Sequence, residues 1–449
     1  MEQNFDLLSR EFMIGSQKSC LYFIDGDGYG QVTTQIMRAF MDYGKSGPKE
    51  KITAKDAMDR LIPFVEIDEV TEYEKSIDML LAGTVMLIID GISKAFIIDA
   101  KNFPQRTVGE PEKDKVIRGS HDGFVEIPIF NAALIRRRIR STNLLMEGFT
   151  VGKESHSDVV VCYMKDRCNE TFLEALKKQI QDLEIEALTM NQETLAENLF
   201  PRKWYNPYPL VRYSERPDET SAAILQGYVV LLVDNSPAAM ILPANFLDSI
   251  KESNDYYFPP ITGTFYRLVK ILLLLLSLLL TPVWLCLLQN PESMPQGLNF
   301  LIIKEPVAVP LIVQLFVMEF VLEVMRISTI NTPNVLGTSI SIVGALFVGE
   351  FAVKSGWMAS EVVFYMSFLA VALYASPDFE FGYAMKFFRM FLLLTTAIFG
   401  VWGLAGGIIL ILLLTITTKN AAGEAYFYPV IPFSWKGIMI RVKRDRLRK

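Results

Sequence analysis

The chain has 449 residues, enough for two or three domains, and 51% of its residues are hydrophobic. Its formal net charge of −6 excludes a nucleic-acid-binding protein of the basic kind. The sequence contains only two histidines, and its four cysteines form no Cys-x-x-Cys pair. We therefore expect free thiols in a reducing compartment and predict no metal site, no cofactor and no nucleic-acid partner.

The first 260 residues alternate charged and apolar stretches, as a soluble α/β region does. Ser19–Ile24 is a predicted strand, which leads through the glycine-rich turn Asp25–Gly30 into an amphipathic helix. Such a turn can cradle an anion, but this one matches neither the P-loop nor the GxGxxG pattern, which favours a plain turn. No secretory signal begins the chain, so this region is expected to stay in the cytoplasm.

Two helices and a β-hairpin are predicted next. The helices cover Lys55–Ile62 and Val70–Leu81, and the hairpin strands cover Thr84–Ile89 and Ser93–Ile98. The Asp-Gly pair between the two apolar runs is a strong short-range hairpin signal.

This pattern occurs a second time. Leu81–Asp90 aligns without a gap with Leu225–Asp234, so that Gly83 corresponds to Gly227. A strand is again predicted upstream, over Asp158–Met164. We therefore predict two related α/β subdomains in tandem, with a chance similarity of two hairpins as the alternative.

An arginine-rich helix is predicted between the two subdomains, over Asn131–Arg140, with Leu134, Ile135 and Ile139 on its inward face. The other sides carry four basic residues, Arg136, Arg137, Arg138 and Arg140. A solvated basic face is the usual explanation of such a run. The second interpretation is a contact with an acidic surface of a neighbouring subunit or with lipid headgroups.

The second half of the chain is dominated by apolar runs. Ile271–Leu288 is uncharged and, with its flank, long enough to cross a bilayer, which takes about 20 residues. Arg267 and Lys270 precede it, as interface anchors do. Four more apolar stretches follow: Val307–Met325, Leu336–Val353, Val362–Ala375 and Phe387–Thr417.

The last stretch is longer than a bilayer needs, and it contains glycines where a helix could bend or pack closely, at Gly400, Gly403, Gly406 and Gly407. The basic segment Lys436–Lys449 follows and is expected to be cytoplasmic. An odd number of crossings would separate this tail from the soluble region. We therefore expect one stretch to be re-entrant, interfacial or broken.

These patterns predict a fold of two tandem α/β subdomains followed by an all-α polytopic membrane domain. The predicted parts are a first subdomain (1–110), a connecting segment with the arginine-rich helix (111–144), a second subdomain (145–260), a transmembrane domain (261–420) and a basic cytoplasmic tail (421–449).

Charged residues inside the apolar stretches are the candidates for an ion path. A charge at mid-membrane costs about 2.5–3.5 kcal/mol on the insertion scale, so such residues normally face the protein interior or water. Glu319 has no basic residue at i+3 or i+4 and is the first candidate. Glu323 has Arg326 nearby, for which a structural pair is a sufficient explanation, and Glu350 is the next candidate. Small residues near Glu350 are predicted to pack helices closely, at Gly337, Ser341, Gly344 and Gly349.

Five motifs together resemble the A subunits of GerA-type spore germination receptors. They are Ile117–Phe124, Ala133–Ile139, Tyr213–Asp218, Met318–Arg326 and Val343–Glu350, and the resemblance runs from about Asp6 to Trp435. The family also has two related soluble subdomains followed by a membrane domain. The start close to the first subdomain, without a long polar extension, is more similar to the stage V sporulation AF branch of that family.

The resemblance implies a multi-pass protein of the inner membrane of endospores. It implies a homo-oligomer, a pentamer, that conducts ions and releases small cations during germination. It also implies membrane lipid and other germination membrane proteins as partners. In the receptors a different subunit is thought to sense the nutrient, so the resemblance implies no nutrient site here.

Other functions stay open. A non-conducting scaffold of a germination complex is one alternative. A secondary transporter is another, although transporters often repeat their membrane halves, whereas the repeat visible here lies in the soluble region. An enzyme is not expected, since the sequence offers no nucleophile–base set, metal cluster or nucleotide motif.

Overall fold

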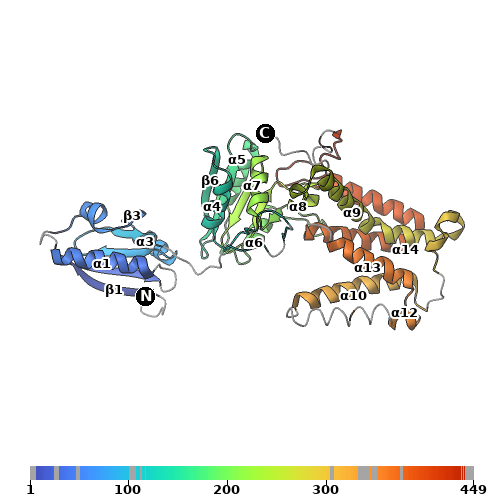
Figure 1. Ribbon diagram of the computed structural model, residues 1–449, viewed down its shortest axis with the longest axis horizontal. Coiled ribbons are helices and arrows are strands. Elements are labelled where there is room, and N and C mark those ends of the chain that lie inside the picture. The colour runs from blue at the N-terminus through green and yellow to red at the C-terminus, as the bar shows by residue number, and fades with distance from the viewer. Residues whose placement is uncertain are drawn as a thin grey trace. The chain divides into compact units, whose positions relative to one another are not determined.

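The computed structural model describes residues 7–24, 30–46, 51–100, 108–111, 114–116, 118–303, 308–331, 344, 351–374, 378–435, 437 and 439. It consists of two compact units, Met1–Thr107 and Val108–Lys449 (Figure 1). Several of the features predicted above lie outside the described residues, namely the turn 25–29, Gly337, Ser341, Gly349, Glu350 and nearly all of the basic segment Lys436–Lys449.

The first unit is a five-stranded antiparallel sheet with helices on both faces. Its strands are β1 (Leu7–Ile14), β2 (Gln17–Ile24), β3 (Ile67–Val70), β4 (Val85–Ile89) and β5 (Ala95–Ile98), in the order β1-β2-β4-β5-β3. Its helical segments are α1 (Gly30–Ser46), α2 (Ala54–Asp56), the π-helical turn η1 (Ala57–Leu61) and α3 (Tyr73–Leu81). α1 and η1 cover one face of the sheet, and α3 covers the other.

The second subdomain has the same architecture within the second unit. Its strands are β6 (Leu144–Val151), β7 (Ser157–Met164), β8 (Arg212–Ser214), β9 (Val229–Val233) and β10 (Ala239–Leu242), in the order β6-β7-β9-β10-β8. Its helices are α4 (Pro128–Arg138), α5 (Glu170–Gln181), α6 (Gln192–Leu199) and α7 (Pro217–Leu225). The two sheets thus share one strand order, as the predicted repeat requires.

The centre of the second sheet shows why its sequence is apolar throughout. All five residues of β9 are buried. Val229, Leu231 and Val233 pack beneath α5 and α6, whereas the alternate residues Val230 and Leu232 pack beneath α4 and α7. A strand that is covered on both faces has a continuously apolar sequence rather than an alternation of apolar and polar residues.

The glycine repeated before the central hairpin has a conformational reason. Gly83 and Gly227 have φ angles of +88° and +96°, a region that L side chains rarely adopt. A Cβ on Gly227 would also lie 2.6 Å from the carbonyl oxygen of Arg167. Asn235 occupies the place of Gly91 in the following turn with φ +56°, which asparagine tolerates better than most residues.

Two predicted helices have boundaries that differ from the structure by two or three residues. The helix predicted to start at Val70 starts at Tyr73, because Ile67–Val70 is a strand that pairs with β5. The arginine-rich helix starts at Pro128 and ends at Arg138, so Arg140 lies beyond it. Proline suits the first helical turn because it lacks the N–H that would have no partner there.

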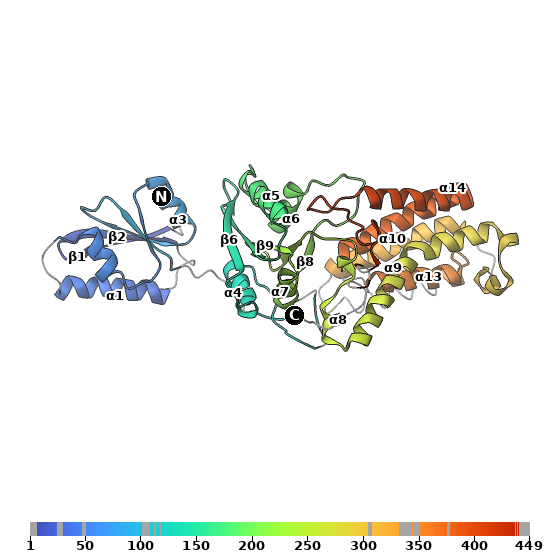
Figure 2. The same ribbon diagram turned by 90° about the horizontal axis from the view of Figure 1, so that it is seen from above.

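A helical region follows the second subdomain. Its elements are the short turn η2 (Asp248–Ile250), α8 (Ser253–Tyr257), α9 (Pro260–Gln289), the 3₁₀ turns η3 (Pro291–Ser293) and η4 (Gln296–Leu301), α10 (Leu311–Asn331), α12 (Ala352–Lys354), α13 (Ser360–Tyr374) and α14 (Phe379–Thr417). Of the described helices, α9 and α14 are long and apolar enough to cross a membrane, and α13 is a shorter apolar helix. α9 and α14 pack along each other (Figure 2).

α14 is a hairpin of two helical arms rather than one straight rod. Gly400 has φ +58° and ψ −136°, which interrupts the helical backbone. A Cβ on Gly407 would lie 2.7 Å from Cδ2 of Leu392, and one on Gly403 would lie 1.9 Å from the carbonyl oxygen of Thr395. Residues this far apart in sequence meet only if the chain reverses at Gly400. The expected bend is therefore found at Gly400 and the expected close packing at Gly403 and Gly407, whereas a Cβ on Gly406 would have nothing within 4 Å.

The segment after α14 returns to the second subdomain. The side-chain amide of Asn420 donates a hydrogen bond to Oδ1 of Asn245 (2.8 Å), and the backbone N–H of Phe246 donates to the carbonyl oxygen of Tyr426 (3.1 Å). At the other end of α14, the ring of Tyr208 in the second subdomain stacks on Phe381 with a centroid distance of 6.3 Å. Both ends of α14 therefore lie near the α/β subdomain, with Gly400 at the far end of the hairpin.

Candidate functional site

Four charged side chains meet between α10 and the first arm of α14, and we call them the helical ion cluster: Glu319, Glu323, Lys386 and Arg389. The Nε of Arg389 donates a hydrogen bond to Oε1 of Glu319 at 2.7 Å. The Nζ of Lys386 lies 2.6 Å from Oε2 of Glu323 and 3.6 Å from Oε2 of Glu319. The hydroxyl of Tyr383 donates to the other oxygen of Glu323 at 2.7 Å.

The helical ion cluster is withdrawn from the surface. Glu319 is 3% exposed, Arg389 5% and Lys386 8%. Arg389 also donates to the carbonyl oxygen of Ser277 at 2.9 Å, so the cluster joins α9, α10 and α14. Buried charges persist only when they are paired and hydrogen-bonded, and here two carboxylates balance two cations.

Arg326 and a cavity lie beside this cluster. The guanidinium carbon of Arg326 is 4.5 Å from the ring centroid of Phe379 and 4.4 Å from that of Tyr383, within the range of cation–π attraction. The cavity has a volume of about 220 Å³ and is lined by cluster residues, Arg326 and apolar side chains of α10 and α13. Glu323 was expected to lie near Arg326, and it also accepts hydrogen bonds from Lys386 and Tyr383.

Sequence reasoning missed Lys386 and Arg389. Glu319 indeed has no basic residue one turn away on its own helix, but its partners come from a helix far along the chain. The available signal was Arg389, a cation inside an otherwise apolar run. Whether Glu319 faces an ion path remains a prediction.

The four arginines of α4 and the residues just after it fall into two groups. Arg136 donates to the carbonyl oxygens of Ser141 and Leu144, both at 3.0 Å, and Arg138 pairs with Asp122 at 3.1 Å. These two guanidinium groups hold the subdomain's own loops. Arg137 and Arg140 are exposed and remain the candidates for a subunit contact.

Of the predicted helix-packing residues, the structure describes Gly344. A Cβ at this position would lie 2.8 Å from Cε of Met325 in α10. The glycine therefore lies against α10, where the end of a flexible methionine could shift to admit a methyl group.

The two cations before the first apolar run do not project freely as anchors. The Nε of Arg267 donates to Oδ2 of Asp255 at 3.1 Å, and the Nζ of Lys270 lies 3.0 Å from Oδ1 of Asp255 and 2.5 Å from Glu252. Because Asp255 and Arg267 are buried, these ion pairs fix α8 against the start of α9.

Two of the motifs that carry the family resemblance are in contact: Tyr213–Asp218 and the described part of Ile117–Phe124, residues 118–124. Arg216, which is fully buried, donates to the carbonyl oxygens of Asp114 (3.2 Å) and Ser120 (2.8 Å) and to the carboxylate of Asp218 (2.7 Å). The motif Tyr213–Asp218 thereby holds the connecting segment against α7. Burial and the hydrogen bond to Asp218 raise the pKa of Tyr257, whose hydroxyl also accepts from the N–H of Ser120.

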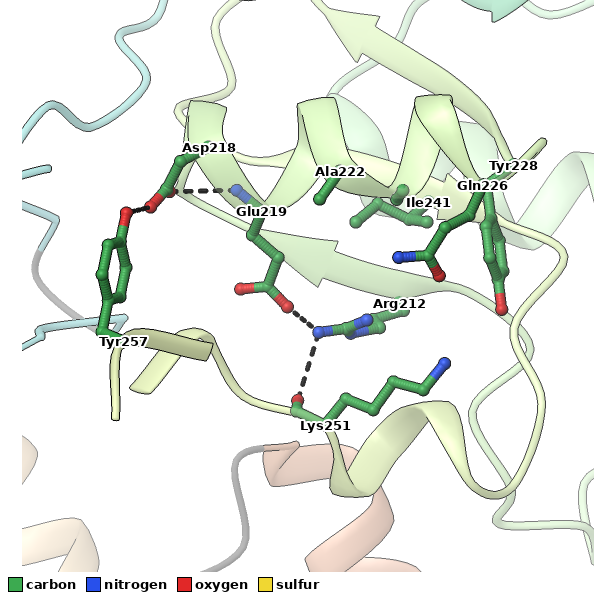
Figure 3. A pocket seen from close by; sticks show the side chains of 10 residues that line it. Arg212, Asp218, Glu219, Ala222, Gln226, Tyr228, Ile241, Lys251 and Tyr257 are labelled. Atoms are coloured by element: carbon green, nitrogen blue, oxygen red, sulfur yellow. Dashed lines mark hydrogen bonds and ion pairs between the residues drawn. The ribbon is translucent and has the colours of Figure 1, made fainter. Parts of the chain in front are cut away.

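A cavity of about 180 Å³ opens beside this junction, between α7, β10 and the segment that leads to α9 (Figure 3). Arg212 pairs with Glu219 and donates to the carbonyl oxygen of Lys251 at 3.2 Å, while Lys251 pairs with Asp248 at 2.7 Å. The charged groups of the cavity are thus paired with each other or with the neighbouring Asp248 and Arg216, and they connect the sheet to the start of the helical region.

The first unit has a cavity at the equivalent place. Met79, Ala82, Thr84 and Ile97 line it, and their counterparts in the repeat, Ala223, Gln226, Tyr228 and Ile241, line the second cavity. The first cavity differs in its charge, since Glu66, Asp68 and Asp99 complete its wall. In the described part of the chain, no group of three or more His, Cys, Asp or Glu side chains is placed to hold a metal ion.

Two similar α/β subdomains followed by long apolar helices with a buried ion cluster define a membrane-associated protein of mixed architecture. Residues 1–449, the whole chain, match the family described as "Bacillus/Clostridium GerA spore germination protein". The chain belongs to this family of spore germination proteins, which confirms the resemblance.

Individual relatives agree with the family assignment. The chain is 31% identical to "Stage V sporulation protein AF" of Bacillus subtilis over 98% of this chain and 88% of that protein. It is 28% identical to "Uncharacterized membrane protein YfkQ" of the same organism over 84% of this chain and 74% of the relative. One solved structure is similar in sequence, the crystal structure of the N-terminal domain of the A subunit of the Bacillus megaterium spore germinant receptor GerK3. The alignment covers 55% of this chain and 91% of that chain at 21% identity. Its TM-score of 0.23 is too low to bear on the fold.

Proposed function

We propose that this chain is the membrane-spanning subunit of a homo-oligomeric assembly, a pentamer, that conducts small cations in the inner membrane of a germinating endospore. The observation that carries this proposal is the helical ion cluster, because ionisable residues among membrane helices are costly and mark functional sites by default. The GerA family assignment supports the germination context and other germination proteins as partners.

The hairpin of α14 supports a multi-pass topology. Its first arm, from Phe379 to Gly400, is about 30 Å long at 1.5 Å per residue, which matches the thickness of a bilayer core. If α14 supplies two crossings and the four earlier stretches one each, the total is even. The basic tail then lies on the same side as the α/β subdomains, and no re-entrant stretch is needed.

The cluster geometry suggests how conduction is controlled. Lys386 lies between the two carboxylates, closer to Glu323 than to Glu319. A small shift of α10 along α14 that breaks the hydrogen bond from Arg389, while Lys386 stays on Glu323, leaves the carboxylate of Glu319 available to a passing cation. One such carboxylate per subunit forms a ring, which concentrates cations and repels anions.

Purified protein in planar bilayers under a salt gradient tests this proposal. Glu319→Gln keeps size and hydrogen bonding but removes the charge, so it should lower cation conductance and move the reversal potential toward zero. Glu424→Gln, at an exposed position after α14, is the matched control and should behave as wild type. Unchanged selectivity and conductance in an assembled Glu319→Gln protein would remove Glu319 from the path.

A non-conducting scaffold is the second candidate, and one observation favours it. Glu319 is almost fully buried and already hydrogen-bonded to Arg389, as expected of a rigid structural core. If the chain is a scaffold, the assembled wild-type protein should carry no current, even under conditions in which its partner proteins function. The channel predicts current that Glu319→Gln alters.

A further inference from the structure

The loop 201–205 of the second subdomain presents aromatic and basic side chains to its surroundings. All five residues are exposed, Trp204 at 96% and Tyr205 at 50%. The two rings contact each other edge-on, and Nζ of Lys203 lies 5.8 Å from the Tyr205 ring. A tryptophan so exposed on a folded subdomain is unusual, since large apolar groups normally bury most of their surface.

This loop is fixed to the end of the α14 hairpin. The guanidinium of Arg202 pairs with Glu380, in the first turn of the first arm, at 3.1 Å. The side-chain amide of Asn206 donates to the hydroxyl of Thr418, just beyond the second arm, at 3.0 Å. Trp204 and Tyr205 are therefore held beside the point where both arms end.

The length of the α14 hairpin determines the depth at which the loop 201–205 lies in the membrane. Gly400 lies about 20 residues from Glu380, or about 30 Å at 1.5 Å per residue, the thickness of a bilayer core. When the reversal lies at one interface, Glu380 and the loop paired to it lie at the other. This step rests on the proposed membrane-spanning function.

A second segment supplies an independent observation. Phe433 and Trp435 are largely exposed, and their rings contact each other after the second arm of α14. The chain leading to them is held near the same end, because the ring of Phe427 packs against Phe246 of the second subdomain at 4.6 Å. The sequence then continues with seven basic residues and one acid from Lys436 to Lys449.

We propose that Trp204, Tyr205, Phe433 and Trp435 form an aromatic collar that inserts into the headgroup layer of an anionic phospholipid membrane. Tryptophan and tyrosine prefer this layer because their rings combine an apolar body with a polar tip. Lys203 and the basic tail add attraction to anionic headgroups. The collar places the second subdomain directly on the lipid surface rather than above it.

Depth-dependent quenching of single tryptophans in full-length protein tests the collar. The chain has five tryptophans, and four can be replaced by phenylalanine to leave Trp204, Trp402 or Trp284 alone. The protein is reconstituted in vesicles whose lipids carry a nitroxide at the headgroup or at the chain end. We expect Trp204 to be quenched at least about twofold more by the headgroup nitroxide, as interfacial tryptophans are.

The other two tryptophans separate this proposal from the proposed function. Trp402, 84% exposed beside the reversal of α14, reports whether the hairpin enters lipid, and the buried Trp284 reports background quenching. Quenching of Trp402 without quenching of Trp204 overturns the collar and leaves membrane insertion standing. Quenching of neither residue above the Trp284 level overturns membrane insertion itself.

The charge of the lipid provides a second measurement. Phosphatidylglycerol in place of part of the phosphatidylcholine should strengthen quenching of Trp204, and Lys203→Glu should remove that gain. Equal quenching of Trp204 in both lipids would overturn the anionic-lipid preference.

Discussion

Arg389→Met should destabilise the helical region more than any other single neutral substitution in the helical ion cluster. It removes the cation that donates directly to Glu319 and leaves a carboxylate that is only 3% exposed. Breaking a buried ion pair by removing one partner costs about 3–5 kcal/mol. At roughly 2–4 °C per kcal/mol for a domain of 150–250 residues, the midpoint of thermal unfolding should fall by about 6 °C or more.

The double variant Glu319→Leu with Arg389→Met supplies the comparison. It removes both charges and fills the space with apolar groups, a change that is often neutral or even stabilising in buried pairs. We therefore expect the double variant to unfold well above the Arg389→Met single variant. The difference measures the coupling between the two side chains.

Thermal unfolding of gel-filtered protein in detergent, followed by tryptophan fluorescence, is a suitable assay. Arg140→Met is the matched control, because Arg140 is exposed and its Nε contacts a single carbonyl oxygen at 3.3 Å. Equal midpoints for Arg389→Met and Arg140→Met would refute the reasoning. So would a double variant whose loss equals the sum of the two single losses.

Three further outcomes follow from other parts of the chain. Gly400→Ala should lower the midpoint of thermal unfolding, at a cost of about 1–3 kcal/mol, because a φ of +58° with a ψ of −136° is accessible essentially only to glycine. The control Gly406→Ala should leave the midpoint unchanged, because a Cβ there would have nothing within 4 Å. Gly227→Ala should likewise destabilise the second subdomain through its φ of +96° and the contact with a backbone oxygen, whereas Gly148→Ala in open space should have little effect on a denaturation curve. Burial raises the pKa of the Cys162 thiol to about 12. At pH 8 we therefore expect this thiol to be alkylated only as fast as the subdomain opens, which mass spectrometry can follow. Rapid labelling of the folded protein would contradict this.

The proposed oligomer can be tested through Arg137 and Arg140, two exposed arginines of the segment 136–140. Arg137→Glu with Arg140→Glu should weaken the assembly in gel filtration at low salt, while Lys178→Glu on the exposed side of α5 should not. An oligomer that survives equally well in both variants would show that the face is only solvated.

The central hairpins could be predicted because their signals are local. Asp90 and Gly91 mark the turn, and Gly83 marks the backbone that precedes the strand. The edge strands β1 and β6 could not be predicted in this way. Arg10 and Glu11 interrupt the first, and Glu147 and Gly148 interrupt the second, so their strand conformation comes from pairing with β2 and β7.

The helical ion cluster could be predicted only in part. The two glutamates are visible as charges within an apolar stretch, and their spacing places them on one face of α10. Their partners are 63 to 70 residues away, on a helix whose placement depends on the packing of α9, α10 and α14. The sequence likewise marks Gly400 as a place to bend, but the full reversal follows from the close approach of the two arms.

That reversal bears on how the chain enters a membrane during synthesis. The residues around the turn are apolar, with Phe399, Val401 and Trp402 exposed on either side of Gly400. A loop between two membrane helices normally obliges the insertion machinery to carry polar groups through the hydrocarbon layer. Here the tip contains no charged residue, so under the proposed membrane-spanning function both arms can enter from the ribosome's side as one preformed pair. The final step of biogenesis then requires no hydrophilic segment to be translocated.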